Sequence, residues 1–208
     1  MGCSATNMSV SPYNEFIHGT GTGFNVTVWC VPSEPVKGYE MKVSFNPTVL
    51  QATAVYEGNI FSGYSTFYSS GVINNTAGTI INVYGLILGT GNVTEAGSLV
   101  IIHFNSLGLG GSAIHVYDEG VCNESTYVTL TETDGCRRVY GDYMPWDLNQ
   151  DNHCNYLDVS GIVSNYLQSC EPGEYYWDIV SDGVCNYLEV SCIVSHFNNN
   201  FRNTYGIQ

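Results

Sequence analysis

The C-terminal part of the chain contains a gapless internal repeat, which restricts its fold more than any other feature of the sequence. The segment WDLNQDNHCNYLDVSGIVSNY begins at Trp146, and the segment WDIVSDGVCNYLEVSCIVSHF begins at Trp177, 31 residues later. Both copies share the Trp-Asp start and the runs Cys-Asn-Tyr-Leu, Val-Ser and Ile-Val-Ser. Such self-similarity predicts that both copies fold into the same local unit.

Each copy begins with a loop of twelve residues in which alternate positions carry oxygen atoms. Alternate residues of a tight loop point inward, and calcium takes six to eight oxygen ligands in such a loop. The predicted ligands of the first loop, where position 7 contributes its backbone carbonyl, are Asp147, Asn149, Asp151, His153, Asn155 and Asp158. Asn152 occupies position 6, where glycine is usual, and asparagine tolerates the left-handed backbone needed there. The alternative is an Asx-rich turn without a metal.

The second loop is predicted to bind calcium more weakly than the first. Its expected ligands, again with a backbone carbonyl at position 7, are Asp178, Asp182, Val184, Asn186 and Glu189. Position 3 is Val180, whose side chain cannot bind a cation, although Glu189 can bind through both carboxylate oxygens and offset part of that loss. We therefore expect this loop to lose its ion first as the calcium concentration falls.

An amphipathic helix is predicted after each loop, because apolar residues recur at the spacing i, i+3, i+4 and i+7. These residues are Val159, Ile162, Val163, Tyr166 and Leu167 after the first loop and Val190, Ile193, Val194 and Phe197 after the second.

Residues 1–136 are dominated by alternation with a period of two, which is typical of strands with one buried face. Phe24, Val26, Val28 and Cys30 form one such series, and Met41, Val43 and Phe45 form another. Further strand-like runs are Thr79–Leu88, Ser98–Asn105, Ser112–Tyr117 and Tyr127–Thr133. Many short strands separated by Gly, Pro and Asn clusters predict a mainly β fold, a sandwich or jelly roll.

The run VKGYEMKVSFNPTVLQATAVYEGNIF, residues 36–61, resembles a cohesin domain, as do the later runs AGTIINVYGLI and GSLVIIHFNSLGLGGSAIHV. The resemblance covers roughly residues 4–135. It implies a nine-stranded jelly-roll sandwich that binds dockerin modules through one sheet face. The alternative is a generic sandwich, including a carbohydrate-binding module.

The duplicated loop-and-helix unit, which lacks a helix before each loop, resembles a dockerin over residues 146–200. The resemblance implies partner contacts at loop positions 10 and 11, which are Tyr156, Leu157, Tyr187 and Leu188. The two leucines could instead pack in the core of the unit. The expected organisation is a cohesin-like sandwich at 1–136, a short linker at 137–145 and a dockerin-like module at 146–208.

The eight cysteines contain no CxxC pair, so a zinc site is not expected and disulfides in an oxidising compartment are. Position 8 residues of paired loops face one another across a short bridge, which predicts a bond between Cys154 and Cys185. The other expected pairs are Cys170–Cys192, Cys122–Cys136 and Cys3–Cys30.

Acidic residues outnumber basic ones by 19 to 5, and a net charge of −14 disfavours binding to nucleic acid or anionic membranes. No apolar run approaches the ~20 residues that span a bilayer. The first residues do not resemble a signal peptide, so a leader is expected to have been removed. The glycosylation sequons are Asn7, Asn25, Asn74, Asn92 and Asn123. An extracellular or cell-surface glycoprotein is predicted.

No sequence motif of an enzyme is present, so a non-catalytic protein is expected. Two complementary modules on one short-linked chain predict head-to-tail self-assembly into a filament or array braced by calcium. One alternative is a cellulosome-type adaptor that joins other cohesin- or dockerin-bearing proteins. Another is a surface protein that binds glycans through exposed aromatic residues such as Trp29.

Overall fold

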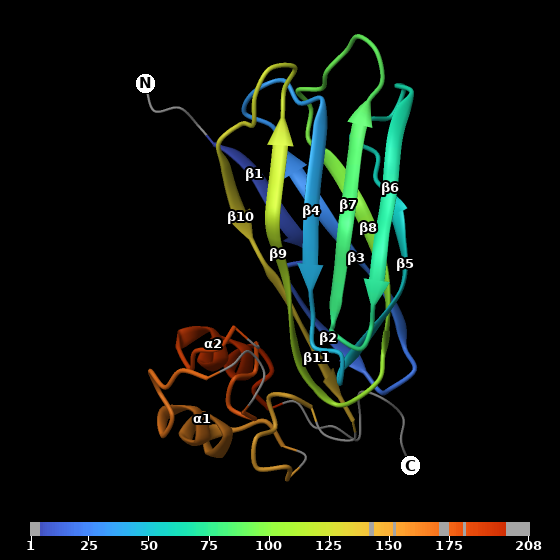
Figure 1. The fold of residues 1–208 in the computed structure, drawn as a ribbon. Coiled ribbons are helices and arrows are strands. Elements are labelled where there is room, and N and C mark those ends of the chain that lie inside the picture. The colour runs from blue at the N-terminus through green and yellow to red at the C-terminus, as the bar shows by residue number, and fades with distance from the viewer. Residues whose placement is uncertain (1–4, 142–143, 152, 171–174, 181, 199–208) are drawn as a thin grey trace.

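The computed structural model describes residues 5–141, 144–151, 153–170, 175–180 and 182–198. It shows a sandwich of two sheets and a small unit of two short helices beside the base of the sandwich (Figure 1). Within these residues, no helix is long and apolar enough to cross a membrane. The predicted fold class is confirmed as a mainly β sandwich with two C-terminal helices.

The two sheets interleave strands from all parts of the first 140 residues. The first sheet has the order β10-β1-β3-β8-β5, formed by Leu130–Thr133, Thr6–Ser11, Gly23–Val31, Gly97–Ser106 and Leu50–Glu57. The second has the order β2-β11-β9-β4-β7-β6, formed by Asn14–His18, Gly135–Tyr140, Gly110–Cys122, Gly38–Ser44, Thr79–Ile87 and Thr66–Asn74. Neighbouring strands are antiparallel except for the pairs β1–β10 and β2–β11, which are parallel.

The core lies between the sheets and follows the predicted alternation. In β3, Val26, Val28 and Cys30 are buried while Asn25 is exposed. Phe45 meets Phe104 edge-to-face, with 5.1 Å between the ring centroids. The buried hydroxyl of Tyr39 donates a 2.8 Å hydrogen bond to the carbonyl oxygen of Leu99, so this phenol enters the core without an unpaired donor.

Strand β11 extends the sandwich into the predicted linker. It runs to Tyr140, so residues 137–140 belong to the second sheet and not to a connection. Arg137 on this strand is fully buried; its Nη1 donates to the carbonyl oxygen of Cys136, and its Nε lies 3.3 Å from Glu15 Oε2. Strands β1, β2, β5, β6 and β11 were not among the predicted strand-like runs.

None of the predicted disulfides is formed where the structure describes both cysteines, because the thiols of Cys122, Cys136, Cys154, Cys185 and Cys192 are free. Cys122 ends β9, whereas Cys136 lies opposite Ala113 near the other end of that strand. Nine residues of strand separate the two sites, about 30 Å at the usual rise. A disulfide needs Cα atoms within roughly 7 Å. Cys3 is outside the described residues, and its predicted partner Cys30 is buried in β3 as a free thiol.

Candidate functional site

Each helix of the C-terminal unit begins inside a predicted calcium loop. Helix α1 spans Tyr156–Val163 and helix α2 spans Tyr187–Ser195. Asn155 and Asn186, at loop position 9, are the N-caps, and each side chain accepts a 2.8 Å hydrogen bond from the backbone two residues later. The residue at loop position 12 completes a capping box in both copies. The helix starts therefore fix the positions of the last predicted ligands of both loops.

Approximate two-fold symmetry relates the two halves of the unit. Cys154 Sγ donates to the carbonyl oxygen of Ile193 at 3.3 Å, and Cys185 Sγ donates to the carbonyl oxygen of Ile162 at 3.4 Å. Each thiol thus engages the backbone of the opposite helix and not the other thiol, which explains why Cys154–Cys185 is not a disulfide. Cys170, predicted to pair with Cys192, places its Sγ 3.7 Å from Asp178 Oδ2.

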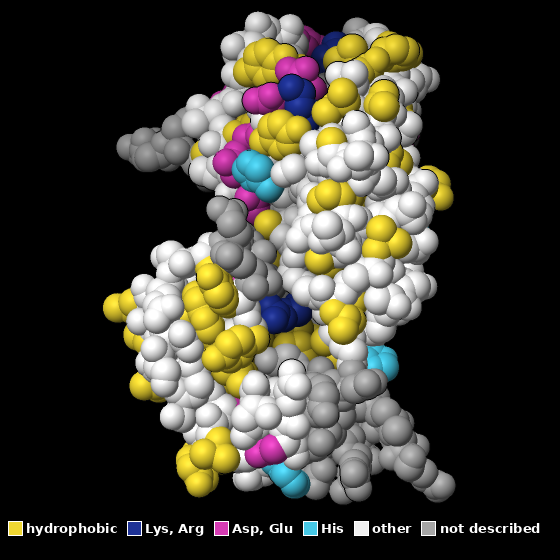
Figure 2. All heavy atoms as spheres, turned by 60° about the horizontal axis from the view of Figure 1, so that its bottom comes forward, with side chains coloured by type: hydrophobic (Ala, Val, Ile, Leu, Met, Phe, Trp, Pro, Cys, Tyr) yellow, Lys and Arg dark blue, Asp and Glu magenta, His cyan; other side chains and the backbone are white. Residues whose placement is uncertain are grey.

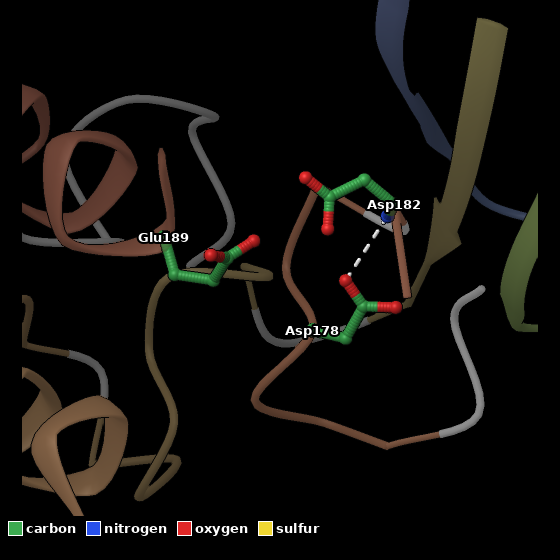
Figure 3. A group of neighbouring side chains, drawn as sticks. All are labelled: Asp178, Asp182 and Glu189. Atoms are coloured by element: carbon green, nitrogen blue, oxygen red, sulfur yellow. Dashed lines mark hydrogen bonds between the residues drawn. The ribbon is translucent and has the colours of Figure 1, made fainter. Parts of the chain in front are cut away.

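The second loop brings three carboxylates together. Ligand atoms of Asp178, Asp182 and Glu189 all lie within 4.8 Å of one another. Figure 3 shows the carboxylate of Glu189 reaching from α2 toward the two aspartates of the loop. Backbone amides of Asp182 and Gly183 donate to the two carboxylate oxygens of Asp178 at 3.1 and 3.2 Å, which fixes this first residue of the loop.

Glu189 is the residue that most directly indicates a cation at this loop. Its side chain is fully buried, Oε2 accepts from the backbone amide of Asn186 at 2.7 Å, and Oε1 has no hydrogen-bond partner. Burial raises the pKa of the Glu189 carboxyl, and the nearby carboxylate of Asp182 raises it further. A buried, unpartnered carboxylate oxygen beside two other carboxylates fits a hard divalent cation such as calcium.

The first loop repeats part of this arrangement, since the amide of Asp151 donates to Asp147 Oδ1 at 3.1 Å as the amide of Asp182 does to Asp178. Asp158 Oδ1 accepts from the amide of Leu148 and Oδ2 accepts from the amide of Asn155, both at 2.8 Å. The Asn149 Nδ2 donates to Asp151 Oδ2 at 2.9 Å. Among the described residues, the acidic groups of this loop do not converge as those of the second loop do. Three carboxylates are thus brought together only in the second of the two described loops, and the order of calcium affinity predicted from Val180 stays a prediction.

Position 7 and position 9 take the same arrangement in both loops. The Asn155 Nδ2 lies 3.5 Å from the carbonyl oxygen of His153, and the Asn186 Nδ2 lies 3.2 Å from that of Val184. The side-chain oxygen of each asparagine accepts a hydrogen bond at the start of a helix. This oxygen is therefore less available to bind a calcium ion than the sequence suggested. Val180, at position 3 of the second loop, is only 7% exposed, whereas its counterpart Asn149 is exposed.

The helical unit contacts the sandwich through residues that the sequence analysis did not single out. Arg138 on β11 donates from Nη1 to the carbonyl oxygen of Asp178 at 2.7 Å. Phe16 on β2 packs edge-to-face on Trp146, with 5.6 Å between the ring centroids, and joins the small core of the unit. Burial lowers the pKa of Arg138, and the nearby Asp178 opposes that shift. The second predicted calcium loop is thereby tied to strand β11.

Replacing Arg138 with alanine is expected to loosen the helical unit without unfolding the sandwich. A hydrogen bond from a charged donor contributes about 1.5–3 kcal/mol, and here it joins the two parts of the chain. Hydrogen exchange in calcium should show faster exchange in α1 and α2 and unchanged protection in β3 and β8. Lys42 of β4, a half-buried cation of the sandwich, is changed to alanine as the control and should leave all four elements as in the unchanged chain. Equal protection of the helices in both variants would contradict the role of Arg138.

Strands β6 and β7 expose four apolar side chains, with the exposed Ser70, Asn74 and Asn82 among them. We call Phe67, Val72, Ile81 and Leu86 the β6–β7 patch; all are exposed, and neither strand contains a charged residue. Phe67 lies opposite Leu86, and Val72 lies opposite Ile81.

The part of the same sheet that contains β4 and β9 is charged. Lys42 of β4 pairs with Asp118 of β9 at 2.7 Å, and His115 pairs with Asp134 at 2.6 Å. Figure 2 shows hydrophobic side chains on the helical unit and scattered over the sandwich, and most of the acidic side chains in view gathered toward the upper end, next to basic and hydrophobic ones. The sheet face is thus divided into a neutral half and a charged half.

The remaining predicted site residues lie on accessible surface. Tyr156, Leu157 and Tyr187 are exposed and Leu188 is half-buried, so the leucines do not form the core of the unit. Among the sequons, Asn25, Asn74 and Asn92 are exposed and Asn7 and Asn123 are half-buried; glycosylation stays a prediction. Trp29 is half-buried on β3.

Comparison with known proteins identifies the sandwich. The model of the cohesin domain family matches residues 20–136. A non-cellulosomal cohesin from Archaeoglobus fulgidus is 17% identical, with a TM-score of 0.52 over 66% of this chain and 92% of that chain. Among curated proteins, none matches the chain.

Two further solved structures show the same fold. The cohesin module of a family 33 glycoside hydrolase from Clostridium perfringens is 12% identical, with a TM-score of 0.54 over 66% of this chain and 98% of that chain. A chain of a type I cohesin–dockerin complex from Clostridium thermocellum is 13% identical, with a TM-score of 0.52 over 68% and 99% of the two chains. The family match spans more than half of the 208 residues, and this chain belongs to the cohesin family.

Proposed function

We propose that this protein is a non-catalytic extracellular assembly protein whose copies join head to tail. In this proposal, the cohesin sandwich of one copy binds the C-terminal calcium-loop unit of the next. The observation that carries it is the presence, on one chain, of a cohesin sandwich with an uncharged β6–β7 patch and a two-helix unit with exposed apolar side chains. The solved cohesin–dockerin complexes support a protein partner for such a sandwich.

Charge supports contact through these two surfaces. Each copy carries a formal net charge of −14, so two copies repel one another unless they meet through uncharged regions. The β6–β7 patch lies on strands without charge. The single acidic residue of each helix, Asp158 in α1 and Glu189 in α2, is buried in its loop and leaves the exposed helix surface neutral.

The placement of the helical unit favours a neighbouring copy over an internal contact. The unit is tied to β2 and β11, at one edge of the second sheet, whereas β6 forms the other edge. Strands β9 and β4 lie between the anchor and the patch. A unit fixed at one edge leaves the patch of its own sandwich available, and a head-to-tail contact between copies extends into a filament unless its rotation closes a ring.

Calcium would brace the unit that makes this contact. Asp178, Asp182 and Glu189 would hold an ion at the second loop, and Glu189 lies in the first turn of α2. Binding would remove the repulsion among these carboxylates and fix the loop against the helix. The first loop, through Asp147, Asn149, Asp151 and Asp158, would supply a second site of lower organisation.

Sedimentation velocity over a concentration series, with calcium and with a chelator, tests this proposal. We expect species larger than one chain in calcium and a shift toward monomer in the chelator. A chain that stays monomeric at high concentration in calcium would contradict self-assembly. If that monomer instead binds separate cohesin- or dockerin-bearing proteins, the adaptor function is correct.

A further inference from the structure

We propose that the helical unit offers only its first half, helix α1 and the loop before it, to the β6–β7 patch of a second copy. The second half is withheld because it lies against the sandwich of its own chain. This inference rests on the proposed head-to-tail assembly and specifies which surface makes the contact.

The two halves of the unit are nearly equivalent by themselves. Their helices have matching N-caps, and the thiols of Cys154 and Cys185 bond to equivalent carbonyl oxygens of the opposite helices. The amide of Leu167 donates to the carbonyl oxygen of Cys185, and the amide of Asn198 donates to that of Cys154, both at 2.8 Å. A partner that met the isolated unit would find two similar surfaces, one on each half.

The rest of the chain makes these halves unequal. Four matched positions of the two loops differ in exposure, with the second-copy residue the more buried, whereas helix residues such as Val163 and Val194 are similarly exposed. Asn149, Asp151, His153 and Leu157 are exposed, whereas Val180, Asp182, Val184 and Leu188 are buried or half-buried. The asymmetry therefore follows the placement of the unit against the sandwich and not its own internal fold.

The sandwich contacts the second half through identified residues. Arg138 of β11 bonds to the carbonyl oxygen of Asp178, the first residue of the second loop. Asp182 and Cys136 line one cavity of about 220 Å³ together with Tyr13, which precedes β2. In Figure 1, α2 lies nearer the sandwich and α1 lies on the outer side of the unit. A partner as wide as a second sandwich therefore has free access to α1 and is hindered at α2.

The exposed surface of the first half fits the β6–β7 patch in chemistry. Its large exposed side chains are all uncharged: Tyr156, Leu157, Val163, Tyr166 and Leu167. The patch is uncharged as well, and α1 itself exposes no acidic residue, so that Asp151 of the preceding loop is the exposed carboxylate nearest in sequence to this surface. One contact surface per unit gives every junction the same rotation, so the copies form one regular assembly and not a mixture of geometries.

Val163 and Val194 offer a matched pair of variants for the test. They occupy equivalent positions in the two helices and are 62% and 57% exposed. A carboxylate forced into an apolar contact stays unpaired there, so we expect Val163→Glu to weaken self-association roughly tenfold or more. Val194→Glu should associate like the unchanged chain. Sedimentation velocity in calcium measures both, and circular dichroism checks that each variant is folded.

The outcomes separate this inference from the proposed function. If the unchanged chain assembles and Val194→Glu alone is impaired, or both variants are impaired equally, the assignment to α1 is wrong while self-assembly stands. If the unchanged chain is monomeric, the proposed function fails and this inference fails with it. Should a glutamate variant not fold, the pair Tyr166→Ser and Phe197→Ser tests the same two surfaces with a smaller disturbance.

Discussion

Glu189→Gln is expected to weaken calcium binding at the second loop by roughly tenfold or more, about 1.4 kcal/mol or above. The change keeps the size of the side chain but removes the charge of a buried carboxylate whose Oε1 has no other partner. Saturating calcium at 100 times its dissociation constant stabilises a folded protein by about 2.7 kcal/mol, so much of that gain should be lost. Isothermal titration calorimetry gives the affinity, and thermal unfolding with and without calcium gives the stability.

The sign of the stability change should reverse in a chelator. Without calcium, Glu189 is a buried charge beside Asp178 and Asp182, so its neutral replacement should leave the protein as stable as before or more stable. Asp158→Asn in the first loop is the matched control and should have a smaller effect, because both oxygens of Asp158 already accept backbone hydrogen bonds. A larger loss of calcium affinity from Asp158→Asn would show that the first loop is the principal site.

Phe67→Glu is expected to abolish self-association at concentrations where the unchanged chain assembles. Phe67 is 55% exposed and lies in the β6–β7 patch, so a glutamate there would place an unpaired charge in the apolar contact. Tyr56→Glu is the control, because Tyr56 is an aromatic residue of similar exposure, 57%, on β5 of the other sheet. Sedimentation velocity in calcium should show a monomer for the first variant and assembly for the second. Loss of assembly in both would indicate a general effect of added negative charge.

The sequence predicted the sandwich where strands alternate regularly and missed it where they do not. Val26 and Val28 are buried as their period of two indicated. Strand β6 was not predicted, because Ser, Gly and exposed apolar residues interrupt its alternation of buried and exposed positions. The backbone is irregular here as well: Gly71 has a φ of 75°, and Asn82 of the adjacent β7 has a φ of 60°. Strand β11 was not predicted, because it contains two successive charged residues, Arg137 and Arg138. Charged residues are rarely buried, yet Arg137 is buried beside Glu15.

Calcium binding at the two loops stays a prediction, and the way the carboxylates of the second loop converge depends on tertiary structure. In the sequence, Val180 indicated only that one ligand position of the second loop is missing. In the structure, Val180 is buried, so this loop is packed into the protein. The convergence of Asp178 and Glu189 depends on the start of α2 and on the contact with Arg138, neither of which follows from loop spacing. The disulfide between Cys122 and Cys136 was excluded only by strand register.

Mixing two differently defective variants tests head-to-tail assembly most directly. Phe67→Glu disables the patch but keeps the helical unit, and Val163→Glu disables α1 but keeps the patch. Each should be a monomer alone in calcium, and an equimolar mixture should form a complex of one chain of each, with no larger species. A mixture that stays monomeric, or either variant that assembles alone, would contradict the proposed contact between α1 and the β6–β7 patch.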